Sequence, residues 1–230
     1  MSGERDRERP PAPEPLPHPV VDNHCHLDAS VPDALPLPLE DVLAASADVG
    51  VPRIVQIGCD LPGARWAVEA ASSYDALVAG VALHPNEAPR LPDLDAAMAE
   101  IEQLAGAHAE VLAVLDEEGA PERWVMHCFS GNARFARACL DRGAFLSFAG
   151  TVTFKNAQPV RDALTVTPLD RVLVETDAPF LTPTPYRGRP NASYLVPVTV
   201  RAMAEIRGED LTTLCEAVDA TTDVAFGGPW

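Results

Sequence analysis

Hydrophobic residues along the chain form short apolar clusters that alternate with longer stretches of helical periodicity. Short clusters bounded by turn residues predict strands, and apolar residues that recur at helical spacing predict helices. The strands are expected at residues 20–23, 53–57, 77–83, 123–127, 145–149 and 172–175. The helices are expected at residues 39–48, 64–72, 94–104, 111–118, 132–142, 158–165, 195–207 and 211–218. This alternation implies parallel strands joined by helical crossovers.

Polar residues that follow the strands favour a (β/α) barrel over a doubly wound sheet. They are His24 and His26, Asp60, His84, His127 and Asp177. Polar groups contributed by several strands at their carboxyl ends are typical of the (β/α)8 barrel. A doubly wound dinucleotide fold is disfavoured, because no glycine-rich phosphate loop follows the first strand. We therefore expect an α/β protein with a TIM-type (β/α) barrel.

The predicted barrel has too few strands. Between residues 83 and 123 the pattern predicts two helices in succession and no strand. About six strands are expected, whereas eight βα units typically need roughly 250 residues. The barrel is therefore expected to be incomplete, with about six of its eight strands.

Composition is that of one ordinary globular domain, with 230 residues of which 47% are hydrophobic and 22% charged. Residues 1–18 are charged and proline-rich without an apolar core, which predicts a disordered tail rather than a secretory signal. Residues 19–230 are expected to form a single domain. No apolar run is long enough to cross a membrane, and no protein partner is evident.

The cysteines indicate the compartment, and the net charge limits how the protein could bind nucleic acid. The five cysteines are scattered and odd in number, which argues against a disulfide framework and favours a reducing cytoplasm. The net charge of −17 argues against a broad basic surface for nucleic acid. It is compatible with a nuclease, because a metal site can receive one phosphate locally.

The stretch that ends the first strand carries the strongest chemical signal. Side chains alternate across a strand, so His24 and His26 share a face and Cys25 points to the other. Two imidazoles at the end of a strand can bind one divalent cation. A pair of ordinary surface or core histidines is the alternative.

Two later strands end in residues of the same chemistry. His127 follows an apolar strand and precedes a Ser-Gly turn, where it could be a ligand or a hydrogen-bonded core histidine. Asp177 follows the last strand and shares a face with Glu175 by alternation. A buried carboxylate there needs a partner or a metal, although a turn aspartate before Pro179 would also fit.

The remaining candidates have weaker signals. His84 could lie near the site, and Asp60 is more typical of a turn residue. The loop at residues 186–191 is basic within an acidic chain, so Arg187 or Arg189 could bind a phosphate or simply be solvated.

Six motifs, taken together and in order, resemble the TatD family of metal-dependent DNases. They are HCHLD at 24–28, GVALHPN at 80–86, HCFSG at 127–131, SFAGTVTFKN at 147–156, VLVETDAPFL at 172–181 and YRGRPN at 186–191. The resemblance implies a TIM-type barrel of the amidohydrolase superfamily that uses divalent metals to hydrolyse DNA. By position it implies that His24, His26 and Asp177 bind one metal, that His127 belongs to a second, and that Asp177 is catalytic. It also implies that Arg187 and Asn191 contact the substrate.

The chain departs from the family pattern in its middle. The family has a Gly-Glu-x-Gly-Leu-Asp motif, whose glutamate bridges two metals, and then an Ile-His-x-Arg motif, whose histidine binds the second metal. Neither occurs here, and we infer a deletion of about two βα units with its junction near residues 105–112. Glu110, Glu117 and Glu118 lie in helix-like sequence and are poor substitutes.

The sequence thus leaves three hypotheses. The first is a TatD-like deoxyribonuclease with DNA or a nucleotide as its substrate. The second is a metal-dependent hydrolase of another substrate class, since this barrel hosts many chemistries. The third is an inactive deletion product. The metal would be Zn, Mn, Ni or Mg, with two ions in the family and at most one held tightly here.

Overall fold

The computed structural model describes residues 8–29, 37–82 and 122–228. The strands are β1 (Val21–Cys25), β2 (Arg53–Gly58), β3 (Leu77–Val81), β4 (Val125–Met126), β5 (Phe145–Phe148) and β6 (Val172–Val174). The helices are α1 (Leu39–Asp48), α2 (Leu61–Ser73), α4 (Ala133–Leu140), α5 (Gln158–Val166), α6 (Val196–Arg207) and α7 (Leu211–Phe226), with short 3-10 turns η2 (Gly150–Thr153), η3 (Leu169–Arg171) and η4 (Ser193–Leu195). The predicted helices at 94–104 and 111–118, and His84, lie outside the described residues.

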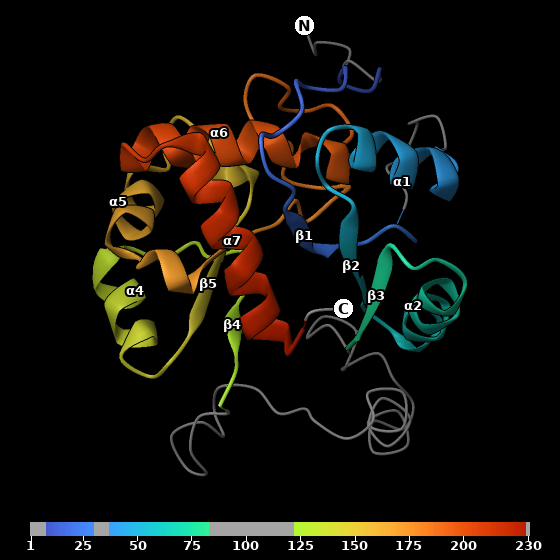
Figure 1. The fold of residues 1–230 in the computed structure, drawn as a ribbon, viewed down its shortest axis with the longest axis horizontal. Coiled ribbons are helices and arrows are strands. Elements are labelled where there is room, and N and C mark those ends of the chain that lie inside the picture. The colour runs from blue at the N-terminus through green and yellow to red at the C-terminus, as the bar shows by residue number, and fades with distance from the viewer. Residues whose placement is uncertain (1–7, 30–36, 83–121, 229–230) are drawn as a thin grey trace, which may run out of the picture.

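All strand pairs in the described part of the chain are parallel, as the alternating pattern predicted. Strands β1, β2 and β3 form one sheet in that order, and β4, β5 and β6 form another. The helices cover these strands, with α2 against β2 and β3 and with α4, α6 and α7 beside the second sheet (Figure 1). The chain is therefore an α/β protein in which helices surround parallel strands.

The two sheets meet where β1 runs beside the segment that follows β6. Asp177 N–H donates to the His24 carbonyl at 2.9 Å, and His26 N–H donates to the Ala178 carbonyl at 2.7 Å. Cys25 and Ala178 form a parallel bridge between these two bonds. We call this junction the β1–β6 seam. It makes the strand order of the described residues β3-β2-β1-β6-β5-β4.

Buried polar side chains reinforce the seam one residue earlier. Asp22 is fully buried and accepts hydrogen bonds from Thr176 N–H at 2.8 Å and from the Thr176 hydroxyl at 2.6 Å. Asn23 donates to the Val174 carbonyl at 2.9 Å and to the hydroxyl of Thr222 in α7 at 3.2 Å. Burial raises the pKa of Asp22 to about 6, although the hydrogen bonds from Thr176 limit the rise.

The largest hydrophobic core lies between the second sheet and its helices. It contains fully buried side chains from strands, loops and helices, among them Phe129, Phe148, Leu164, Leu195, Met203 and Leu214. Helix α7 extends beyond its predicted end at residue 218, because Thr221, Thr222 and Ala225 also bury their side chains. None of the helices in the described ranges combines the length and apolar character that a membrane crossing requires.

Residues 8–18 are ordered, which corrects the prediction of a disordered tail over this part of residues 1–18. Leu16 is buried and its N–H donates to the Val49 carbonyl at 3.1 Å. Tyr194 donates to the Pro10 carbonyl at 2.9 Å, and Arg201 donates to the Pro15 carbonyl at 3.0 Å. Proline fixes the backbone and leaves carbonyls free as acceptors, so a proline-rich segment can bind along a protein surface without secondary structure. Residues 1–7 lie outside the described part of the chain.

Replacing Thr176 with valine is expected to destabilise the protein through the seam. The Thr176→Val variant keeps the side-chain shape but leaves one oxygen of buried Asp22 without its hydroxyl donor. The free energy of unfolding should fall by about 1–3 kcal/mol, as is typical for an unsatisfied buried acceptor. Urea denaturation measures it. Thr165→Val makes the same change at an exposed position of α5 and should alter stability by less than about 0.5 kcal/mol. Equal stability of both variants would show that the Asp22–Thr176 bond contributes nothing.

Candidate metal centre

The β1–β6 seam places three candidate ligands in contact. His24 and His26 lie at the end of β1 and just beyond it, and Asp177 lies on the adjacent segment. Asp177 Oδ1 is 3.8 Å from His24 Nε2 and 3.4 Å from His26 Nε2. All three side chains are only slightly exposed. Residues separated by about 150 positions in sequence therefore converge on one point.

A hydrogen bond outside this group sets the orientation of His26. Its Nδ1 lies 2.9 Å from the Ile57 carbonyl of β2, and a carbonyl can only accept, so Nδ1 carries a hydrogen. That arrangement turns Nε2 toward Asp177. Metal-binding histidines are commonly oriented by a carbonyl or carboxylate on their other ring nitrogen.

The turn that carries Asp177 is held from both sides. Asp177 has a φ of 55°, which is uncommon for a residue other than glycine and occurs at functional sites where the surroundings fix it. Asn191 donates to the Thr176 carbonyl at 3.0 Å and to the Phe180 carbonyl at 2.6 Å. One amide thus anchors the backbone before and after the aspartate.

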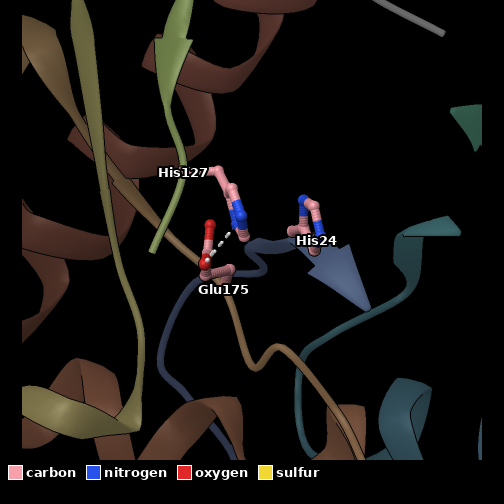
Figure 2. Close-up of side chains that lie close together, drawn as sticks. All are labelled: His24, His127 and Glu175. Atoms are coloured by element: carbon pink, nitrogen blue, oxygen red, sulfur yellow. Dashed lines mark hydrogen bonds and ion pairs between the residues drawn. The ribbon is translucent and has the colours of Figure 1, made fainter. Parts of the chain in front are cut away.

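A second group lies beside the first and shares His24 (Figure 2). His127 follows β4, and its Nδ1 is 3.2 Å from Glu175 Oε1. The same carboxylate oxygen accepts the Cys128 N–H at 2.8 Å. The sequence left His127 as the only ligand of a second group, but the structure brings a fully buried glutamate against it.

Burial and neighbouring charges give the three imidazoles different protonation. His24 and His127 stack with ring centroids 3.9 Å apart, and His24 meets His26 edge to face at 5.0 Å. Burial and then the charges of His127 and His26 lower the pKa of His24 to about 2. Burial opposes protonation of His26, but hydrogen bonds to Asp177, Cys59 and Ile57 outweigh it and raise its pKa to about 10. Burial also opposes protonation of His127, yet Glu175 raises its pKa.

These donors fit a divalent metal ion. In each group, His24–His26–Asp177 and His24–His127–Glu175, one ligand atom per residue lies within 4.8 Å of the others. Imidazole nitrogens and carboxylate oxygens are ligands that Zn, Mn and related ions accept. Oε2 of Glu175 is buried without a hydrogen-bond partner, which is costly unless an ion or another polar group satisfies it.

The other predicted residues have different surroundings. Arg187 is exposed, with its guanidinium 3.8 Å above the Phe154 ring. Asn191 is 2% exposed, and its oxygen also accepts the Ala192 N–H, so all its polar atoms serve the backbone. Arg187 is therefore open to solvent, whereas Asn191 is not. Asp60 is the N-cap of α2 and accepts from Gly63 N–H at 2.7 Å, which confirms its interpretation as a turn residue.

Glu175 is the residue that sequence reasoning left out of the ligand set. The signal for it was the alternation that puts Glu175 and Asp177 on one face of the same segment. Its pairing with His127 was not visible, because it depends on how close β4 and β6 lie across β5.

Comparison of the sequence with known proteins identifies relatives over most of the chain. A family model described as TatD related DNase matches residues 21–114 and 101–227. An uncharacterized metal-dependent hydrolase TatD of Mycobacterium tuberculosis is 36% identical, over 92% of this chain and 99% of the relative. The uncharacterized metal-dependent hydrolase YabD of Bacillus subtilis is 32% identical over 82% of this chain and 91% of its own length.

Solved structures share the fold. The crystal structure of YJJV, a TatD homolog from Escherichia coli, superposes with a TM-score of 0.74 at 22% identity and covers 91% of this chain and 98% of that one. A TatD family hydrolase from Entamoeba histolytica gives a TM-score of 0.72 at 14% identity with the same coverage. These neighbours are TIM-barrel hydrolases, which agrees with parallel strands surrounded by helices. From the family match and from its relatives, this chain belongs to the TatD family of metal-dependent hydrolases.

Proposed function

We propose that this protein hydrolyses phosphodiester bonds in DNA, with a divalent metal held by His24, His26 and Asp177. The convergence of these three side chains at the β1–β6 seam is the observation that supports it most directly. The family description names a DNase, and the acidic surface leaves the metal as the natural receptor for a phosphate.

Each residue has a distinct role in this proposal. The two imidazoles and the aspartate would hold the ion, and Ile57 fixes the orientation of His26. A bound divalent ion lowers the pKa of water and offsets charge that develops on the phosphate. Asp177 is the catalytic residue, because its second oxygen can accept the proton of the attacking water. Arg187 lies exposed on Phe154, where its guanidinium can hold a phosphate of the substrate.

At most one ion is held tightly in this proposal. The two ligand groups share His24, so only two residues of the second group belong to it alone. The second group consists otherwise of His127, which is about half exposed, and Glu175. Zn, Mn, Ni and Mg all accept such donors, so the identity of the metal is left to measurement.

The proposal includes a shortened barrel. The alignment with the Mycobacterium tuberculosis relative spans 265 positions, whereas 92% of 230 residues is about 212, so roughly 50 positions have no residue in this chain. Two βα units would account for about that length, since a barrel of eight units has about 250 residues. In the strand order of the described residues β3 and β4 are the two end strands, so the missing units of this proposal would belong between them.

A cytoplasmic setting is part of the proposal. All five cysteines are free, which suits a reducing compartment.

Two alternatives to the proposed DNA hydrolysis differ from it in chemistry. One is a metal-dependent hydrolase of amide, ester or small phosphate substrates, and the other is an inactive product of the deletion.

Release of acid-soluble nucleotides from single-stranded and duplex DNA tests the function. We expect metal-dependent release that EDTA abolishes, and a loss of at least about 100-fold in the His24→Ala variant, because one of three metal ligands is removed. His18→Ala removes an imidazole that pairs with Asp219 far from the centre and serves as the control. Turnover of amide or ester substrates without DNA cleavage would favour the first alternative, and no metal-dependent turnover on any of them would favour the second.

Metal content per folded chain tests the ligand set. The protein should retain about one divalent ion after dialysis, and Asp177→Asn should weaken its binding by about 10- to 100-fold, since it replaces a carboxylate ligand. Elemental analysis and calorimetric titration measure both quantities. Asp170→Asn makes the same change at an exposed residue of η3 and should bind metal normally. Two tightly held ions per chain would contradict the predicted count.

Metal binding should release a proton and strengthen with pH. His26 has a pKa of about 10, so it is protonated at neutral pH without metal, and ligation must displace that proton. His24, with a pKa of about 2, is already neutral and releases none. The affinity should rise about tenfold per pH unit between pH 7 and 9, as expected for one displaced proton. Titration calorimetry in buffers of different ionisation enthalpy counts the protons.

A variant in the His24–His127–Glu175 group is the control for the number of protons released. His127→Gln should leave the released proton unchanged if the ion sits between His24, His26 and Asp177. Loss of the proton in this variant would place the ion against His127 and Glu175 instead.

A further inference from the structure

A large aromatic side chain stands exposed beside the candidate metal centre. Phe180 is 51% exposed and lies three residues after Asp177. Its ring centroid is 6.4 Å from that of His26, with the planes inclined at 59°. An apolar ring of this size is normally buried in a folded protein. Its exposure at the edge of the centre therefore needs an explanation.

Hydrogen bonds hold the backbone that carries this ring. Phe180 N–H donates to the Asp177 carbonyl at 2.9 Å, and the Phe180 carbonyl accepts from the buried amide of Asn191 at 2.6 Å. The ring therefore stands on the same turn that holds the catalytic carboxylate. Ordering of the backbone is therefore not part of the entropy cost when a ligand covers the ring.

A cationic side chain belongs to the same loop. Thr184 N–H donates to the Thr153 hydroxyl at 2.8 Å, which ties the loop to η2. Arg187 then stacks on Phe154, next to η2. The loop from Asp177 to Arg187 thus presents an apolar ring near the metal ligands and a guanidinium farther along the chain. A nucleotide chain offers the matching groups, namely flat bases and phosphates.

We propose that the Phe180 ring stacks on a nucleobase next to the scissile phosphate of a DNA substrate. The inference rests on the proposed nuclease function and adds a subsite to it. A phosphate received next to the metal ligands carries a base on its adjoining sugar, and a ring beside His26 is near enough for that base to stack on it. Stacking on an aromatic side chain tolerates every base, because each has a π-face. Phe180 would therefore favour nucleic acid over small phosphodiesters without reading sequence.

Single-stranded oligonucleotides with one abasic nucleotide, moved stepwise along the strand, test the proposal. With the wild-type protein, kcat/KM should fall by about tenfold when the missing base is at one position beside the cleaved bond, as loss of one stacked base predicts. Phe180→Ala should already be about tenfold slower on the intact strand and should lose nothing further at that position. Phe180→Trp should restore both the rate and the abasic penalty.

Two controls separate stacking from a structural role of the ring. Phe135→Ala removes a comparably exposed phenylalanine, 47% exposed, whose ring packs against Phe129 instead of an imidazole, and it should behave as the wild type does. Metal content of Phe180→Ala should equal that of the wild type. Loss of metal in this variant would mean that the ring shields His26, and it would overturn the proposal.

The failures of the two proposals are distinguishable. DNA cleavage by the wild type, with the same abasic penalty retained in Phe180→Ala, would overturn the stacking and leave the nuclease function intact. No cleavage of DNA by the wild type under any metal would overturn both.

Discussion

Two backbone hydrogen bonds between β1 and the segment after β6 hold the rest of the arrangement in place. They join residues near the beginning of the domain to residues near its end, and each bond lies within one residue of a candidate ligand. Asp22 and Thr176 reinforce the junction from inside, where no water can replace their contact. Among the described residues this seam is where the two sheets share an edge, and it brings the HxH pair and Asp177 together.

The seam also concentrates charge that the protein must balance. Three imidazoles and two carboxylates lie together, with Glu175 fully buried. In the absence of metal, pairing compensates the charge, since His26 meets Asp177 and His127 meets Glu175. His24 stacks on His127 and meets His26 edge to face. It stays neutral because burial lowers its pKa and because protonation would add a positive charge beside the other two imidazoles. A divalent ion can take over the compensation from the protons, which is why its binding and the protonation of the histidines are linked.

The sequence predicted those features that depend on local pattern. Alternation along a strand put His24 and His26 on one face, and the apolar clusters located the parallel strands that carry His127 and Asp177 to one rim. The contact between His127 and Glu175 could not be predicted, since it depends on the order of β4, β5 and β6 in space. Asn191 was expected at the substrate, but its buried amide instead holds the turn of Asp177. Residues 8–18 looked disordered by composition, yet side chains from α6 and nearby loops bind their carbonyls.

The spacing of the ligands along the chain has a consequence for how the protein is made. His24 leaves the ribosome early, whereas Asp177 is not synthesised until about three-quarters of the 230 residues are complete. For most of its synthesis the nascent chain therefore holds the imidazoles of His24 and His26 without Asp177, and these three candidate ligands meet only once the segment after β6 has docked on β1. An ion that needs all three of these ligands would thus be bound late in the maturation of the polypeptide.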